Sequence, residues 1–260
     1  MTILYKEAYV INQKLHTKPE ALANLRTHYC AGCTHGIIHR IIAELVDELD
    51  LRELTVGISP VGCAVFAGNY FNFDVVQAAH GRAPAVATGV KRVNPKNFVF
   101  TYQGDGDLAS IGMAEFLHAA IRGESITTIF INNACYGMTG GQMAPTSLLN
   151  QRTTTTPDGR KKDYNGEPVL VAELLSHIGG AVYVNRVSAQ NPHHIAKAKI
   201  AIKEAFLVQL NNLGYSFVEV LSTCPTNWNM TPIQSIKWVE TEMLPFYKLG
   251  KIKDPGAVVL

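Results

Sequence analysis

Residues 98–133 read FVFTYQGDGDLASIGMAEFLHAAIRGESITTIFINN. The apolar runs at Phe98–Gln103 and Ile126–Ile131 are typical of buried strands. Between them, the glycine-rich Gly104–Asp107 predicts a turn and Ser110–Arg122 predicts a helix. A strand, a turn, a helix and a second strand in this order form a right-handed crossover between parallel strands. The stretch therefore predicts a parallel sheet.

The rest of the chain alternates in the same way, which predicts an α/β fold with a single, mostly parallel sheet and helices on both faces. We expect one domain over residues 1–260, with an N-terminal CxxC segment and a C-terminal interface tail. Further strands are expected at Thr55–Ile58, Ala181–Arg186 and Ser216–Leu221, and further helices at Ile37–Leu49, Gly81–Lys91, Val169–Ile178, Pro192–Leu210 and Ile233–Leu244.

Composition narrows the class of protein. The 260 residues carry a net charge of +2 with scattered basic residues, which predicts no nucleic-acid partner. Hydrophobic content of 47% and charged content of 17% exclude disorder, and the low charge indicates surfaces covered by partners. No apolar run approaches the ~20 residues of a membrane span. Because residues 1–14 lack the order of a signal peptide, we expect a cytoplasmic protein without a membrane partner.

One long segment has no helical or strand periodicity. Residues 140–168 are rich in Thr, Gly, Pro and charged residues, and include TTTTPDGRKKDYNGEP. A loop of this length inside a compact domain is usually a lid, a binding loop or an interface segment. An interface segment agrees with the low surface charge and with an obligate partner.

Polar residues follow the two strands of the opening stretch. Asp105 lies between two glycines, and Asn133 ends the second strand. Parallel strands bring both residues to the same edge of the sheet, where open α/β folds bind ligands. A carboxylate and an amide oxygen suit Mg²⁺, and the glycines and the following helix suit a diphosphate. A tight turn and a helix N-cap are the structural alternative, but the placement on adjacent strand ends favours a magnesium-diphosphate site.

The five cysteines are the second group that can carry chemistry. Cys30 and Cys33 form a CxxC pair, Cys63 follows a predicted strand, and Cys224 precedes a proline after the last long strand. Four thiolates from three loops fit an iron-sulfur cluster or a tetrahedral zinc site. A thioredoxin-like pair and isolated buried thiols remain as alternatives. Cys135 is the fifth and lies within NNACYG.

Several motifs in order resemble a known family. They are CAGCTHG from Cys30, HGRA at His80–Ala83, GDGDLASIG from Gly104 and NNACYGMTGGQMAPT from Asn132. The spacing from GDG to NN resembles the thiamine-diphosphate motif. Together the motifs resemble the β, thiamine-diphosphate-binding subunits of 2-oxoacid:ferredoxin oxidoreductases, over most of residues 28–228.

The resemblance implies a role for each matching residue. Mg²⁺ is expected on the Asp105 carboxylate, the Asn133 side chain and the main-chain carbonyl of Cys135, and His80 is expected near the reacting end of the cofactor. The residues expected to line thiamine diphosphate are Gly104, Gly106, Tyr136, Gly137, Met138 and Thr139, and those expected to hold a [4Fe-4S] cluster are Cys30, Cys33, Cys63 and Cys224.

The resemblance also implies a reaction and partners. A 2-oxoacid is decarboxylated oxidatively, the acyl group passes to coenzyme A, and electrons pass through the cluster to ferredoxin. Because the chain contains only one unit of the diphosphate-binding type, an α subunit is expected to supply the pyrimidine-binding domain and its activating glutamate. The assembly can also include γ and ferredoxin-like δ subunits.

Two departures from the family bear on the substrate. CAGCTHG stands where many relatives have CPGCGHG, and Phe66 stands where many have a basic residue after the middle cysteine. An apolar Phe66 favours a branched-chain 2-oxoacid such as 2-oxoisovalerate, with 2-oxoglutarate next. Two other functions stay open: a non-redox thiamine-diphosphate lyase with structural or zinc-binding cysteines, and a non-catalytic iron-sulfur electron-transfer or sensor subunit.

Overall fold

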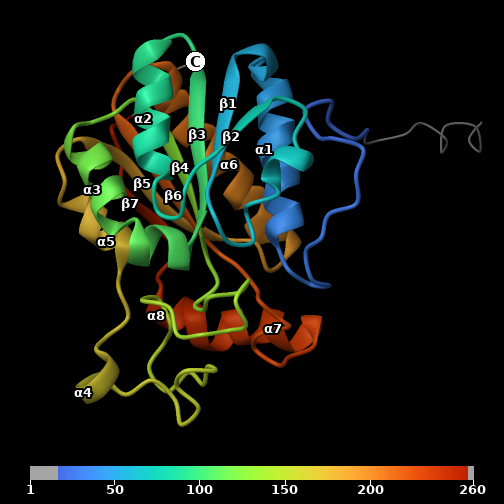
Figure 1. The fold of residues 1–260 in the computed structure, drawn as a ribbon, viewed down its shortest axis with the longest axis vertical. Coiled ribbons are helices and arrows are strands. Elements are labelled where there is room, and N and C mark those ends of the chain that lie inside the picture. Colours follow the sequence, from blue (N-terminus) through green and yellow to red (C-terminus); the bar gives the residue numbers. More distant parts are fainter. Residues whose placement is uncertain (1–16, 257–260) are drawn as a thin grey trace, which may run out of the picture.

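A seven-stranded sheet forms the centre of the computed structural model, which describes residues 17–256 (Figure 1). The strand order is β2-β1-β3-β4-β6-β5-β7, and all neighbours are parallel except β5 and β7. The predicted α/β fold with a mostly parallel sheet is thus confirmed. The strands are β1 (Thr55–Ser59), β2 (Asp74–Gln77), β3 (Phe98–Gly104), β4 (Thr127–Asn132), β5 (Ala181–Ser188), β6 (Tyr215–Leu221) and β7 (Gly250–Lys253).

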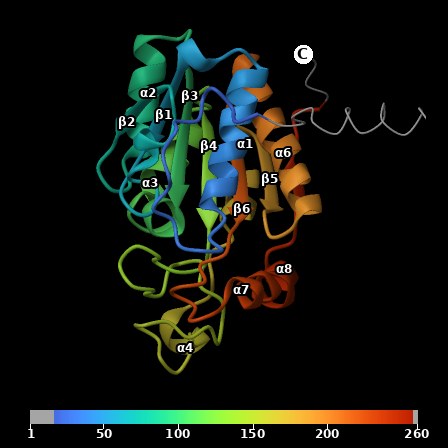
Figure 2. The ribbon, with the colours of Figure 1, turned by 90° about the vertical axis from the view of Figure 1, so that its right-hand side faces the viewer.

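Helices cover both faces of the sheet, as the two views in Figures 1 and 2 show. Helices α1 and α6 pack on one face, and α2, α3 and α5 pack on the other. The α-helices are α1 (His35–Glu48), α2 (Ala83–Val93), α3 (Met113–Ile121), α4 (Lys162–Asn165), α5 (Val171–Ser176), α6 (Pro192–Leu210), α7 (Pro232–Trp238) and α8 (Leu244–Phe246). The 3₁₀- and π-helical turns are η2 (Arg52–Leu54), η3 (Ala67–Asn69), η4 (Asp107–Ile111) and η5 (Val239–Met243).

The buried strands are apolar on both faces, as expected for a sheet covered twice. On the α1 and α6 side, Phe98 and Phe100 pack against Phe206. On the other side, Phe130 packs against Phe217, beside Phe116. The sheet is therefore held by one apolar cluster on each face.

The topology brings the polar strand ends together. From β1 the chain moves outward to β2 and then returns to β3 on the other side of β1. Open α/β sheets bind ligands at such a reversal, beyond the carboxyl ends of the strands. Since Gly104 of β3 pairs with Ile131 of β4, the residues that follow them leave the sheet side by side.

Three local differences from the predictions have physical reasons. Strands β2 and β7 were not predicted, because both are short, largely exposed edge strands with little apolar character. Gly104–Asp107 is not a separate turn, because a helical conformation begins at Asp105 and continues as the π-helical turn η4. Such π turns inside helices often accompany functional sites.

The segments after β4 and β6 form a lobe beyond the carboxyl edge of the sheet (Figure 1). This lobe contains the aperiodic residues 140–168, among which Arg160 is buried. Among residues 17–256, the Arg160 guanidinium donates hydrogen bonds to main-chain oxygens and to no side chain. The acceptors are those of Ala144, Pro145, Ser147, Asn165, Gly166 and Glu167. The Arg160 guanidinium therefore connects both halves of residues 140–168.

Arg160→Ala is expected to loosen this segment, because it removes the guanidinium that joins its main-chain oxygens and leaves the buried Ser147 carbonyl without a donor among the described residues. We expect limited proteolysis to cut within residues 140–168 at least about 10-fold faster than in the wild type, since cleavage follows the population of the open form. Arg152→Ala is the control, because Arg152 lies in the same segment but is exposed. Equal cleavage rates in the two variants would contradict an organising role for Arg160.

Residues 1–16 and 257–260 lie outside the described part of the chain, and with them the N-terminal stretch behind the cytoplasmic prediction. One domain over residues 1–260 stays a prediction for the same reason. Within residues 17–256, no helix combines the length and the apolar character that a membrane crossing requires.

Candidate active site

A cavity of about 190 Å³ opens at the carboxyl edge of β1, β3 and β4. It receives residues from the loops after these strands and from the loop after β2. Most of the predicted cofactor residues lie along its wall. They are His80, Gly104, Asp105, Gly106, Asn133, Tyr136, Gly137, Met138 and Thr139, together with Cys63 of the predicted cluster.

Asp105 is the buried carboxylate of this cavity. Its Oδ2 accepts hydrogen bonds from the Cys135 N–H at 3.0 Å and from the Thr146 hydroxyl at 2.9 Å, and its Oδ1 accepts from the Gly106 N–H at 2.9 Å. Burial raises the pKa of Asp105 to about 7, although these hydrogen bonds oppose the shift. A nearby cation would favour the ionised form of this carboxyl group.

The side chain of Asn133 faces two other oxygens. One terminal atom of its amide lies 2.7 Å from the main-chain oxygen of Cys135 and 3.2 Å from Asp105 Oδ2. With nitrogen at that position, the amide donates a hydrogen bond to both oxygens. With oxygen there, three oxygen atoms face one another, which is a donor set for a hard cation such as Mg²⁺. The three groups that the resemblance assigned to magnesium therefore meet at one point.

The second glycine of GDG makes room for an aromatic ring. A Cβ atom at Gly106 would lie 2.7 Å from Tyr136 Cδ1, closer than real side chains approach. The Tyr136 hydroxyl in turn donates to Ser110 Oγ at 2.9 Å. Tyr136 thus fastens the loop after β4 to the helical segment after β3.

His80 is held by a carboxylate that the sequence analysis gave no role. Asp107 Oδ1 lies 2.6 Å from His80 Nδ1 and accepts from the Gly81 N–H at 2.6 Å. Gln103 Nε2 donates to the other oxygen of Asp107 at 2.6 Å. These contacts orient the imidazole and favour a proton on Nδ1, so Nε2 is the nitrogen left to act in the cavity.

The predicted cluster cysteines lie near one another. A Cβ atom at Gly137 would lie 3.5 Å from the Sγ atoms of both Cys63 and Cys224. Burial and, to a smaller extent, the neighbouring thiols, Cys30 among them, raise the pKa of Cys33 to about 12 and that of Cys63 to about 11. None of these cysteines forms a disulfide. Across residues 17–256, however, no three His, Cys, Asp or Glu side chains are close enough to hold one metal ion.

The sulfur of Cys135 takes part in the same group. A hydrogen bond from the Cys135 thiol lowers the pKa of Cys224, and Asn227 Nδ2 lies 3.2 Å from Cys224 Sγ. Asn227 Nδ2 also donates to the Gly137 carbonyl at 2.7 Å. Cys135 therefore contacts the carboxylate of Asp105 through its main chain and a predicted cluster ligand through its side chain.

His35 also lines the cavity, although the sequence analysis assigned it no role. Its Nδ1 lies 2.6 Å from the Tyr102 hydroxyl, and burial lowers its pKa to about 3. Within the described residues, the buried Tyr102 hydroxyl has no other partner. It therefore donates to Nδ1 and leaves the neutral ring protonated at Nε2. The sequence feature that could have indicated a role for His35 is its position directly after CAGCT, at the start of a helix.

Large apolar side chains surround the mouth of the cavity. Met138 is 50% exposed, which rules out an ordinary core position for it. Val61 and Ile111 line the cavity and are exposed as well. Phe66 does not line the cavity, and its ring instead packs edge-on against His28 with the centroids 5.1 Å apart. Phe66 therefore lends the predicted branched-chain substrate no support through the lining of this cavity.

A family model described as thiamine pyrophosphate enzyme, C-terminal TPP binding domain, matches residues 60–220, more than half of the chain. Named relatives are similar over most of its length. The ketoisovalerate oxidoreductase subunit VorA of Methanothermobacter marburgensis is 47% identical over 94% of this chain and 53% of the relative. The 2-oxoglutarate synthase subunit KorB of Archaeoglobus fulgidus is 39% identical over 82% of this chain and 75% of the relative.

The chain spans about half the length of the VorA relatives it matches. A solved structure is also similar, that of the 2-oxoglutarate:ferredoxin oxidoreductase from Magnetococcus marinus with 2-oxoglutarate, coenzyme A and succinyl-CoA bound. Its TM-score is 0.76 at 26% identity, with 95% of this chain and 87% of that chain covered. The chain therefore belongs to the thiamine-diphosphate-binding subunits of the 2-oxoacid:ferredoxin oxidoreductase family.

Proposed function

We propose that this chain is the β subunit of an enzyme that decarboxylates a 2-oxoacid oxidatively. The acyl group passes to coenzyme A, and the electrons pass through a [4Fe-4S] cluster to ferredoxin. The observation that carries this proposal is the convergence of Asp105, the Asn133 amide and the Cys135 carbonyl in a cavity that Cys63 also lines.

The residues present fit magnesium and a diphosphate. Asp105, Asn133 and the Cys135 carbonyl would hold the cation, and the open space beside Gly104 leaves main chain accessible to phosphate oxygens. Thiamine diphosphate, when bound, would supply a nucleophile for the 2-oxoacid carbonyl and a sink for the electron pair that loss of CO₂ leaves behind. Within the cavity, His80 would exchange a proton through Nε2, while Asp107 holds its ring in place.

We propose that the cysteines hold an iron-sulfur cluster rather than a single zinc ion. The support is the name of the similar solved structure, a 2-oxoglutarate:ferredoxin oxidoreductase, because a ferredoxin-linked reaction needs a one-electron path that redox-inactive zinc does not give. Cys30, Cys33, Cys63 and Cys224 are the proposed ligands.

The proposed partner is an α subunit that brings the pyrimidine-binding domain and an activating glutamate. The exposed apolar rim of Val61, Ile111 and Met138 supports a protein partner at the mouth of the cavity, because exposed apolar patches mark such contacts. Ferredoxin, coenzyme A and further γ and δ subunits complete the proposed assembly. The cytoplasm is the proposed location.

A branched-chain 2-oxoacid, such as 2-oxoisovalerate, is the proposed substrate. The support is the name of the ketoisovalerate oxidoreductase relatives, which are 47% identical to this chain. The 2-oxoglutarate synthase relatives are more distant, at 39% identity or less. We therefore place 2-oxoglutarate second.

Anaerobic purification of the chain with its co-expressed partner tests the function. We expect iron and acid-labile sulfide, Mg²⁺-dependent binding of thiamine diphosphate, and ferredoxin reduction that requires both a 2-oxoacid and coenzyme A. A colourless zinc protein would exclude the ferredoxin-linked reaction. Full activity of this chain alone would contradict the shared active site, and cluster content without cofactor binding would indicate an electron-transfer subunit.

Asp107→Asn is expected to lower kcat by about 100-fold, which is a typical contribution of a positioned acid or base. The asparagine amide can donate to His80 Nδ1 and so favour the opposite tautomer. Steady-state ferredoxin reduction measures the effect, with thiamine-diphosphate binding expected to stay close to wild type. Asp163→Asn, an exposed change in α4, is the control. An unchanged kcat would show that the orientation of His80 is not needed for turnover.

Gly137→Ala is expected to lower the iron and sulfide content without unfolding the protein. The new methyl group would make ordinary contacts with Cys63 Sγ, Cys224 Sγ and Asn133 Nδ2 at 3.4–3.5 Å, so the empty chain tolerates it. It would nevertheless fill space between two proposed cluster ligands. Gly89→Ala, in α2 with open space around it, is the control. Wild-type iron content in Gly137→Ala would place the cluster elsewhere.

A further inference from the structure

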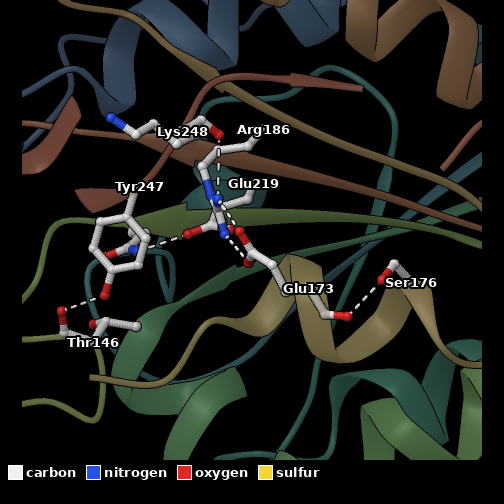
Figure 3. Close-up of polar contacts among 8 residues, drawn as sticks. Thr146, Glu173, Ser176, Arg186, Glu219, Tyr247 and Lys248 are labelled. Carbon is white, nitrogen blue, oxygen red and sulfur yellow. Dashed lines mark hydrogen bonds and ion pairs between the residues drawn. The ribbon is translucent and has the colours of Figure 1, made fainter. Parts of the chain in front are cut away.

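A chain of polar contacts runs inward from Glu173 at the surface through buried Arg186 to buried Glu219 (Figure 3). Arg186 is fully buried, and its Nε donates to Glu219 Oε2 at 2.8 Å. Its two terminal nitrogens donate to Glu173 at 2.7 and 2.5 Å. Glu219 is also fully buried, while Glu173 is 39% exposed. Arg186 and Glu219 stand opposite each other on β5 and β6.

The second oxygen of Glu219 continues the chain to Asn132. Glu219 Oε1 accepts from Asn132 Nδ2 at 2.7 Å, and Asn132 Oδ1 accepts from the Ala134 N–H at 3.1 Å. A carboxylate can only accept, so it requires the amide nitrogen of Asn132 to face it. The amide oxygen must then face Ala134. Glu219 therefore fixes which atom Asn132 offers to the loop.

Ala134 has an unusual conformation for which this contact matters. Its φ is +54°, in the left-handed region that residues with a side chain seldom adopt. Its N–H is held by Asn132, and its carbonyl accepts from Ser147 Oγ at 2.6 Å and Gln151 Nε2 at 2.8 Å. Every main-chain polar group of Ala134 is thus bound by a side chain. This turn brings the side chain of Asn133 beside the carbonyl of Cys135.

A second route leads from Arg186 to the other side of the site. The guanidinium lies 5.2 Å from the centroid of the Tyr247 ring. The Tyr247 hydroxyl donates to the Thr146 carbonyl at 2.6 Å (Figure 3), and the Thr146 hydroxyl donates to Asp105 Oδ2 at 2.9 Å. Arg186 therefore contacts the start of both routes to the three oxygens.

We propose that Asn132 and Glu219 are positioning residues for the bound cation. They hold the turn at Ala134 so that the Asn133 side chain and the Cys135 carbonyl face Asp105. This role rests on the function proposed above. Partners that orient metal ligands typically change metal affinity by about 10- to 100-fold when they are altered.

The donor and acceptor of this pair can be exchanged, which provides a sharp test. Asn132→Asp sets a second carboxylate against Glu219 and should weaken the apparent Mg²⁺ affinity of the assembled complex by about 10- to 100-fold. Adding Glu219→Gln restores one donor facing one acceptor and still leaves an oxygen for Arg186. The double variant N132D/E219Q should therefore return to within about 3-fold of the wild type, because an amide donor again faces a carboxylate acceptor.

The readout is Mg²⁺ titration of thiamine-diphosphate binding by calorimetry, which needs no turnover. Asn185→Asp is the matched control, because Asn185 is a buried strand asparagine whose amide donates to the Tyr183 hydroxyl instead. It should leave the Mg²⁺ affinity at the wild-type value. Thermal melting of each complex separates a general loss of stability from a change in the site.

Wild-type Mg²⁺ affinity in Asn132→Asp would overturn the positioning role, and so would a double variant no better than Asn132→Asp alone. If Asn132→Asp does not assemble with its partner, the Mg²⁺ affinity of N132D/E219Q is the test, and a value well below that of the wild type overturns the role. If neither of these variants assembles, Asn132→Ala is the test, and a wild-type Mg²⁺ affinity in Asn132→Ala overturns the role. Absence of Mg²⁺-dependent binding in the wild type would instead contradict the proposed function itself.

Discussion

Asp105→Ala is expected to abolish Mg²⁺-dependent binding of thiamine diphosphate, with an affinity loss greater than about 100-fold. The change removes one of the three converging oxygens and also the acceptor of the Cys135 N–H and of the Thr146 hydroxyl. The proposed cation would then lose its only anionic protein ligand. Calorimetry on the assembled complex measures the loss, and turnover should fall to background with it.

The proposed iron-sulfur site should remain intact in Asp105→Ala. We expect wild-type iron and sulfide content, because none of the proposed cluster ligands is changed. Asp158→Ala, an exposed change in the lobe, is the control and should bind the cofactor normally. Retained Mg²⁺-dependent binding in Asp105→Ala would show that the cation is held elsewhere. Simultaneous loss of iron would indicate damage to the fold rather than loss of a ligand.

Arg186→Met is expected to lower the free energy of unfolding by about 3–5 kcal/mol, because it leaves buried Glu219 without its cation. Urea unfolding followed by tryptophan fluorescence measures this change. Replacing both members, in R186M/E219L, should recover most of the stability, since an apolar pair of similar volume often replaces a buried ion pair without loss. The same double variant lacks the acceptor for Asn132, so its Mg²⁺ affinity should stay weak.

Arg52→Met is the matched control for this experiment. Arg52 forms ion pairs with Glu20 and Glu53, and both glutamates are at least 80% exposed. Exposed pairs contribute at most about 1 kcal/mol, so this variant should unfold almost as the wild type does. A loss in Arg186→Met no larger than that in Arg52→Met would mean that the buried pair adds little to stability.

The fold was largely predictable because its central strands are continuous apolar runs. Such runs fix the strand positions, and the right-handed crossover rule then brings Asp105 and Asn133 to one edge. The edge strands β2 and β7 lack this signal, because solvent rather than a core faces them. Helix α6 was predicted at its observed bounds, since a proline begins it at its first residue.

Contacts between distant loops were harder to predict. Asp107 reaches His80 because Gly81 and Gly112 let two main chains approach closely, and a Cβ atom at Gly112 would lie 2.6 Å from the Gly81 oxygen. Sequence spacing does not encode such an approach. The Arg186–Glu219 pair did have a signal, because each is a charged residue inside an apolar strand. Buried charges in two strands are expected to be paired, and here they stand in register.

Asparagine at position 133 bears on whether the protein folds before or after it binds a metal ion. With its nitrogen turned inwards, the amide donates to both the Cys135 carbonyl and Asp105, so both oxygens have a hydrogen-bond donor before any ion arrives. Rotation of the amide by half a turn then exposes an oxygen to an incoming ion. An aspartate here would set carboxylates against each other until a metal was captured. Folding and subunit assembly can therefore precede the binding of Mg²⁺ and thiamine diphosphate, and neither is required for the site to form.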